Sequence, residues 1–116
     1  MSDSSFTTIE NVGGTLIATP QREKIGDYES PILRGEVEAT APGAGWRIAM
    51  DMSQVRLVAS AGLGALVAMN QSCKKNGGKL VLFGLDANLK QVFELTKLHR
   101  VLSIVGTREE AIKAIG

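Results

Sequence analysis

The stretch that decides the fold is Asp51-Met52-Ser53-Gln54-Val55-Arg56-Leu57-Val58-Ala59-Ser60-Ala61-Gly62-Leu63-Gly64. The apolar side chains of Val55, Leu57 and Val58 predict a short strand at 56–58. Residues 63–75 repeat apolar side chains at spacings of three and four, which predicts an amphipathic helix. Ser60 lies between the two, so we expect it to be the helix N-cap, with its hydroxyl oxygen accepting the backbone N–H of Leu63. A strand that leads into a helix in this way is typical of an α/β fold.

The sequence before this stretch predicts a hairpin, a loop, a helix and a strand. In chain order we expect strands at 6–10 and 15–18, a loop at 19–25, a helix that begins near Asp27 or Ser30 and ends at 42–45, and a strand at 46–52. Gly13 and Gly14 permit the tight reversal that a hairpin needs. Pro31 suits the first turn of a helix, because its missing N–H would have no partner there.

The sequence after residue 75 alternates strands with helices. We expect a strand at 79–83, a helix from Asp86 to about Leu95, a strand at 101–105 and a short helix at 111–115. Asp86 is predicted to cap its helix, and Thr107 with Glu110 has the spacing of a capping box. The whole pattern predicts an α/β domain with a mixed sheet of about five strands and about four helices packed mainly on one face.

Length and composition indicate one folded domain. The chain has 116 residues, of which 44% are hydrophobic and 22% charged, so we expect a flexible tail at 1–5 and a single domain at 6–116. The net charge is +1 and the longest basic run is the pair Lys74-Lys75, which argues against nucleic acid as a partner. The outer strand at 6–10 is a candidate exposed edge, so we expect a monomer or a weak homodimer.

Cysteine usage and hydropathy predict a cytoplasmic protein without a cofactor. Cys73 is the single cysteine, so no disulfide within the chain is possible, and no cluster of metal ligands accompanies it. We expect it to be a small core residue. The N-terminus lacks the pattern of a secretory signal, and no segment holds about 18 uninterrupted apolar residues, so membrane insertion is not expected.

The 51–64 stretch resembles a segment of STAS domains, the family of anti-sigma factor antagonists. That segment usually reads D-L-S-x-V-x-x-x-D-S-S/T-G-L-G, and the spacing here matches throughout. Residues 75–80 look like the following helix end and strand of the family, and residues 92–98 look like its later helix. The resemblance extends from Trp46 to Ile115.

The resemblance implies a bacterial, non-enzymatic regulator of transcription that works by exchanging partners. Ser60 would be phosphorylated by a partner that is both a serine kinase and an anti-sigma factor, and a metal-dependent phosphatase would remove the phosphate. The unphosphorylated chain would bind the kinase and release a sigma factor. The implied partner-binding residues are Ala59, Ser60, Ala61, Gly62, Leu63, Gly64 and Asp27, with the loop at 19–27 beside the serine.

Two positions depart from the family pattern and keep other interpretations open. Ala59 replaces the usual acid before the serine, and Ala61 replaces the hydroxyl residue after it, which leaves Ser60 as the phosphoacceptor. The alternative is a STAS scaffold subunit, in a sensory or lipid-transport complex, that binds partners without being phosphorylated. A hydrolase with Ser60 as nucleophile and His99 as base is disfavoured, because the chain has no G-x-S-x-G elbow.

Overall fold

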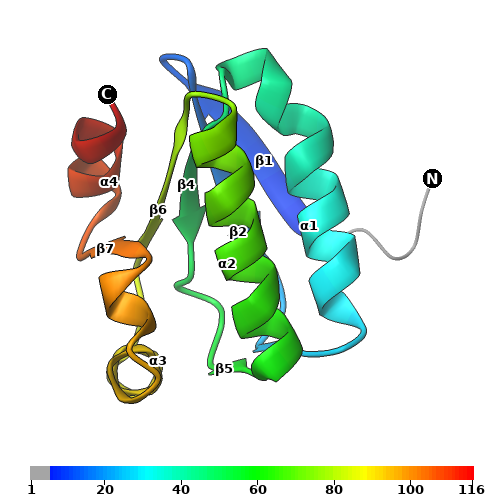
Figure 1. The fold of residues 1–116 in the computed structure, drawn as a ribbon, viewed down its shortest axis with the longest axis vertical. Helices are drawn as coiled ribbons and strands as arrows, with labels where there is room; N and C mark the ends of the chain where they lie inside the picture. The colour runs from blue at the N-terminus through cyan, green and yellow to red at the C-terminus, as the bar shows by residue number, and fades with distance from the viewer. Residues whose placement is uncertain (1–5) are drawn as a thin grey trace.

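A five-stranded mixed sheet forms the centre of the molecule (Figure 1). The computed structural model describes residues 6–116, so the tail at 1–5 lies outside the described residues. The strands are β1 (Thr7–Val12), β2 (Thr15–Pro20), β4 (Arg47–Asp51), β6 (Lys79–Phe83) and β7 (Ser103–Val105). Their order across the sheet is β1-β2-β4-β6-β7; β1 is antiparallel to β2, and the other neighbours are parallel.

Four α-helices cover the two faces of this sheet. They are α1 (Glu29–Thr40), α2 (Ser60–Lys75), α3 (Ala87–Leu95) and α4 (Arg108–Ile115), with short 3₁₀ helices η1 (Ala41–Ala44) and η2 (Leu98–Arg100). Side chains of α1, α2 and α3 join the larger core on one face, whereas α4 covers the other face through Ala111. The predicted fold class is therefore confirmed, including the placement of most helices on one face.

The pleat of the central strands explains how one sequence serves two cores. In β4, Ile48 and Met50 point into the larger core, and Ala49, between them, points into the smaller one. Because both faces are covered, Ile48, Ala49 and Met50 of β4 and the residues of β6 after Lys79 are buried and read as continuous apolar runs. This is the reason that β6 was predicted at its observed bounds.

The N-terminal hairpin and two of the helix caps are also confirmed. Gly13 and Gly14 have φ of 60° and 89°, the left-handed conformations that a tight hairpin turn requires, and the strands are longer than predicted. The Leu89 N–H donates to Asp86 Oδ1 over 2.8 Å. Thr107 and Glu110 form the reciprocal capping box at the start of α4.

The loop predicted at 19–25 is wrong in part, because β2 continues to Pro20 and a further strand follows it. That strand is β3 (Lys24–Ile25), which pairs in parallel with β5 (Leu57–Val58) in a separate two-stranded sheet. Two residues are too few for an alternation of polar and apolar side chains to be visible in the sequence. The pairing holds the segment before α1 against the segment before α2.

The starts of β4 and β7 also differ from the prediction. Trp46 has φ of 61°, so β4 begins only at Arg47. The segment predicted as a strand at 101–105 forms a strand only from Ser103, because Val101 still closes the η2 turn with a hydrogen bond from its N–H to the Leu98 carbonyl. Both differences arise from turn geometry that an apolar run does not reveal.

Candidate functional site

Ser60 is exposed at the first residue of α2, at the end of the molecule where α1 and α2 both begin (Figure 1). The prediction that Ser60 is the N-cap is wrong. Ala59 is the N-cap, with extended backbone (φ −79°, ψ 174°), and its carbonyl oxygen accepts the N–H of Leu63 over 3.0 Å. Among the described residues, the Ser60 hydroxyl has no hydrogen-bond partner, so it is available to solvent and to other molecules.

The backbone of Ala59 is fixed by the two-stranded sheet, which explains why the helix starts early. The Ala59 N–H donates to the Ile25 carbonyl over 3.0 Å, extending the β3–β5 pairing by one residue. The N–H groups of Arg56 and Leu57 both donate to the Glu23 carbonyl, over 2.7 and 3.0 Å. The segment before α1 therefore lies beside Ala59, the residue that precedes the serine, where the resemblance implies the 19–27 loop.

The start of α1 is held by its own local hydrogen bonds. The Gly26 N–H donates to Glu29 Oε1 over 2.9 Å, and the Ser30 hydroxyl donates to the Gly26 carbonyl over 2.6 Å. The hydrogen bond from Gly26 is the main cause that lowers the pKa of the Glu29 carboxyl below its ordinary value, helped by the nearby charges of Arg22 and Lys24. Asp27 lies exposed in this turn.

The two glycines of the 59–64 stretch have different environments. A Cβ at Gly62 would lie 2.6 Å from the Ile25 carbonyl oxygen and 2.7 Å from Val58 Cγ1, so Gly62 allows α2 to pack on the two-stranded sheet. A Cβ at Gly64 would meet nothing within 4 Å. Gly62 is thus explained by packing, whereas the fold places no such demand on Gly64.

The remaining predicted site residues divide by burial. Leu63 is partly buried against the larger core, and Ala61 is half-buried. Together with Ser60 and Gly64 they follow the first turn and a half of α2, so the structure brings the predicted residues of α2 to one end of the molecule, beside the turn that carries Asp27.

Two exposed apolar side chains at this end were missed by the sequence analysis. Tyr28 is 60% exposed at the N-cap of α1, and Leu57 is 53% exposed in β5, three residues before Ser60. Leu57 and Val58 are both apolar, so the sequence gives no sign that the first is exposed and the second buried.

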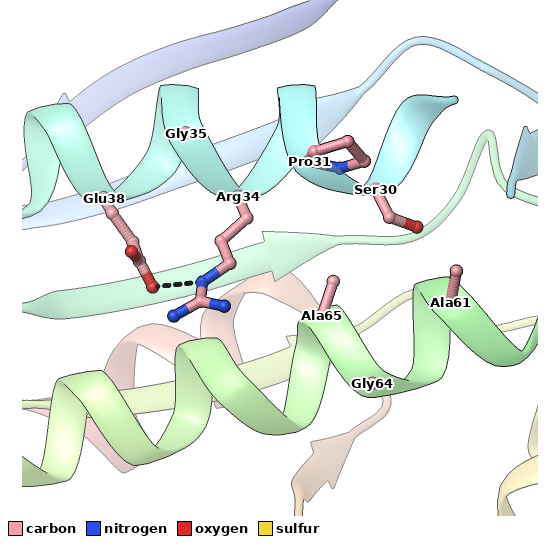
Figure 2. Close-up of a pocket in the computed structure, with 8 residues that line it drawn as sticks. All are labelled: Ser30, Pro31, Arg34, Gly35, Glu38, Ala61, Gly64 and Ala65. Atoms are coloured by element: carbon pink, nitrogen blue, oxygen red, sulfur yellow. Dashed lines mark hydrogen bonds and ion pairs between the residues drawn. The ribbon is translucent and has the colours of Figure 1, made fainter. Parts of the chain in front are cut away.

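A groove runs between α1 and α2 from the end that carries Ser60 (Figure 2). Its volume is about 400 Å³, and it is lined by Ser30, Pro31, Arg34, Gly35, Glu38, Ala61, Gly64 and Ala65. Arg34 Nε and Glu38 Oε2 form an ion pair of 3.0 Å within it. The side chains that line the α2 wall are no larger than a methyl group.

His99 lies in a different environment from Ser60. Its Nδ1 is 3.2 Å from the Phe93 carbonyl oxygen, and the hollow beside it is lined by Lys90, Glu94 and Ile104, without Ser60. The arrangement gives no support to a Ser60–His99 nucleophile pair. Within residues 6–116 there is no group of three His, Cys, Asp or Glu side chains that could hold a metal ion.

Cys73 is a buried core residue of α2, as the sequence predicts. Desolvation raises the pKa of its thiol to about 11, with a smaller contribution from Glu38. A thiol held in its neutral form is a poor nucleophile. In the part of the chain that the structure describes, no helix has the length and apolar character needed to span a bilayer.

Comparisons with known proteins agree on one family. The family model described as "STAS domain" matches residues 31–111. The chain is similar to the anti-sigma-B factor antagonist of Bacillus subtilis, with 32% identity over 91 residues, which cover 78% of this chain and 82% of that protein. It is 30% identical over 87 residues to the anti-sigma-B factor antagonist of Listeria monocytogenes, covering 75% and 76% of the two chains.

Solved structures share the fold at lower sequence identity. An anti-sigma factor antagonist from Mycobacterium paratuberculosis has a crystal structure that superposes with a TM-score of 0.83, at 20% identity and over 98% of this chain and 97% of that chain. At this level of identity the likeness shows that the architecture is common to both chains.

Proposed function

Because the chain belongs to the STAS domain family, we propose that it is an anti-sigma factor antagonist whose docking surface is switched by phosphorylation of Ser60. The observation that supports this most is the position of the Ser60 side chain, which is exposed at the first residue of α2. The partner is an anti-sigma factor that is also a serine kinase, and a metal-dependent phosphatase resets the modified chain. In this proposal the chain acts in the cytoplasm.

A phosphate on Ser60 is compatible with the folded state. The N–H groups of Ser60, Ala61 and Gly62 lie in the first turn of α2, where no preceding turn supplies carbonyl acceptors. A phosphate carries a charge of about −1.5 to −2, which the positive end of the helix dipole and these N–H groups favour. The modification therefore changes the surface without disrupting the helix.

The same charge opposes docking. The end of the molecule that carries Ser60 also carries the exposed side chains of Tyr28 and Leu57, which a partner would remove from water. A phosphate placed in such a contact without a matching cation costs about 3–5 kcal/mol. Since about 1.4 kcal/mol changes an affinity tenfold, phosphorylation would weaken binding by about a hundredfold or more.

The test uses the purified anti-sigma factor kinases encoded in the genome that encodes this chain. We expect one of them to bind the wild-type chain in calorimetry and, with ATP, to add one phosphate by intact mass, whereas Ser60→Ala gains none. Ser60→Asp should bind that kinase about a hundredfold more weakly. Ser103→Asp, at an exposed position in β7, adds the same charge away from the site and should bind like the wild type.

Two outcomes would contradict this function. Equal affinity of wild type and Ser60→Asp would remove the electrostatic switch, and the absence of any binding kinase would remove the antagonist role. A non-switching scaffold is the second candidate function. It is favoured by Ala59, which stands where the family pattern has an acid and leaves the N-cap of α2 without a side-chain hydrogen bond. Intact mass of the chain from its host decides between them, because a scaffold stays unphosphorylated under all growth conditions.

A further inference from the structure

The groove between α1 and α2 has features that the fold alone does not explain. Gly35 and Gly64 line opposite walls, and a Cβ at either position would meet nothing within 4 Å. Glycine inside a helix costs about 1 kcal/mol relative to alanine. Since neither backbone takes a left-handed conformation and neither position is crowded, the two glycines are explained better by an open groove than by packing.

Arg34 supplies a positive group within this groove. Its Nε donates to Glu38 over 3.0 Å, and the two terminal nitrogens have no hydrogen-bond partner among residues 6–116. Figure 2 shows the guanidinium extending from α1 toward α2, with the Cβ atoms of Ala61 and Ala65 pointing toward α1. A guanidinium has five N–H donors, so a second carboxylate can bind the terminal nitrogens while Glu38 keeps Nε.

The positive ends of two helix dipoles also make the groove favourable to an anion. Helices α1 and α2 begin at the same end of the molecule (Figure 1), so the positive ends of their dipoles lie together there. Glu29 lies at this end, but its Oε1 accepts the Gly26 N–H, and Glu38 is already paired with Arg34. Glu29 and Glu38 therefore have partners of their own, and Asp27 lies exposed in the turn before α1.

We propose that this groove receives an acidic side chain, accompanied by a small apolar one, from the anti-sigma factor partner. The carboxylate binds the terminal nitrogens of Arg34, and the apolar group lies against Ala61, Gly64 and Ala65. This inference rests on the proposed function, because the groove is continuous with Ser60 through its neighbour Ala61. The groove contact would be a second contact besides the one at Ser60. It would provide specificity and would not depend on the phosphate.

The test compares variants of both walls against the kinase that binds the wild-type chain. Gly64→Leu fills the groove, and Arg34→Gln removes the charge; each should weaken binding by about tenfold or more. Gln71→Leu adds the same side chain at an exposed position of α2 outside the groove and should bind like the wild type. Arg34→Lys keeps the charge without the planar fork and should give an intermediate affinity.

A salt titration separates the carboxylate contact from simple loss of packing. Wild-type affinity should fall as salt rises, and Arg34→Gln should show a smaller fall, because one charge pair is missing. Thermal unfolding of each variant checks the fold, and the exposed Arg34 side chain keeps the test valid even if Gly64→Leu is unstable.

The outcomes distinguish the groove from the function on which it rests. If Ser60→Asp weakens binding but both Gly64→Leu and Arg34→Gln bind like the wild type, the groove inference is wrong and the function stands. If only Gly64→Leu weakens binding, the carboxylate contact is wrong. If no anti-sigma factor kinase binds the wild-type chain, the function fails, and this inference fails with it.

Discussion

At the scale of single residues, Gly62 and Gly64 make a matched pair within one helix. Gly62→Ala should lower the free energy of unfolding by about 1–3 kcal/mol, because the new Cβ would lie against the Ile25 carbonyl and Val58, and backbone cannot move aside cheaply. Gly64→Ala should raise it by up to about 1 kcal/mol, since alanine favours helix and meets nothing there.

Urea denaturation of both variants measures this difference. Equal effects at the two positions would show that helix propensity alone is responsible and that the approach of α2 to β3 is not tight. The sequence placed both glycines at the helix start but did not distinguish them, because the distance that separates packing from open space depends on Ile25, which is 37 positions from Gly62 along the chain.

At the scale of elements, α2 begins with an N-cap that has no side-chain hydrogen bond. Ala59→Asp should raise the free energy of unfolding by about 1 kcal/mol, because the new carboxylate can accept an N–H of the first turn. Ala59→Asn serves as the uncharged control. If both variants melt at a higher temperature than the wild type, the gain comes from capping; if Asp alone does so, it comes from charge at the helix dipole.

The start of α1 makes stability depend on acid pH through Glu29. The hydrogen bond from Gly26 lowers the folded-state pKa of this carboxyl below 4.5, so its contribution is complete above that value and is lost as the pH falls through the lowered pKa. Glu29→Gln should therefore lose less stability than the wild type as the pH falls below 4.5.

Urea midpoints measured across this pH range test the Glu29 prediction. Glu109→Gln is the control, because Glu109 accepts no hydrogen bond among the described residues. Parallel pH profiles for wild type and Glu29→Gln would show that the hydrogen bond from Gly26 to Glu29 does not hold the helix start in solution.

Which elements could be predicted from the sequence depended on the range of the interactions that define them. The Thr107–Glu110 capping box and the Asp86 cap are local in sequence, and both are present as predicted. The N-cap of α2 was assigned to Ser60 because serine is the better cap by residue type. The hydrogen bond from Ala59 to Ile25, which moves the helix start, connects residues 34 positions apart and has no local signal.

At the scale of the whole molecule, the edges of the sheet determine self-association. β1 is one outer strand, and Glu10 on it pairs with Arg108 over 3.1 Å; the other edge, β7, has three residues. A charged side chain on one edge and a short strand on the other both discourage edge-to-edge pairing. We therefore predict a monomer of 12.3 kDa in light scattering at micromolar concentration, with at most weak dimerisation at higher concentration.

A stable dimer at micromolar concentration would contradict that prediction. Glu10→Val removes the charge from the outer strand, so this variant should dimerise more strongly than the wild type. Glu109→Val, outside the sheet, is the matched control for added apolar surface.

The four-residue pairing of β3 with β5 has a kinetic consequence. It belongs to no other sheet, and it fixes the backbone that precedes both α1 and α2. A short isolated pairing opens more readily than the central strands. Each opening would release the starts of α1 and α2 at once while the five-stranded sheet stays intact. The lifetime of the β3–β5 pairing therefore limits how long the chain presents the complete surface around Ser60 to a partner.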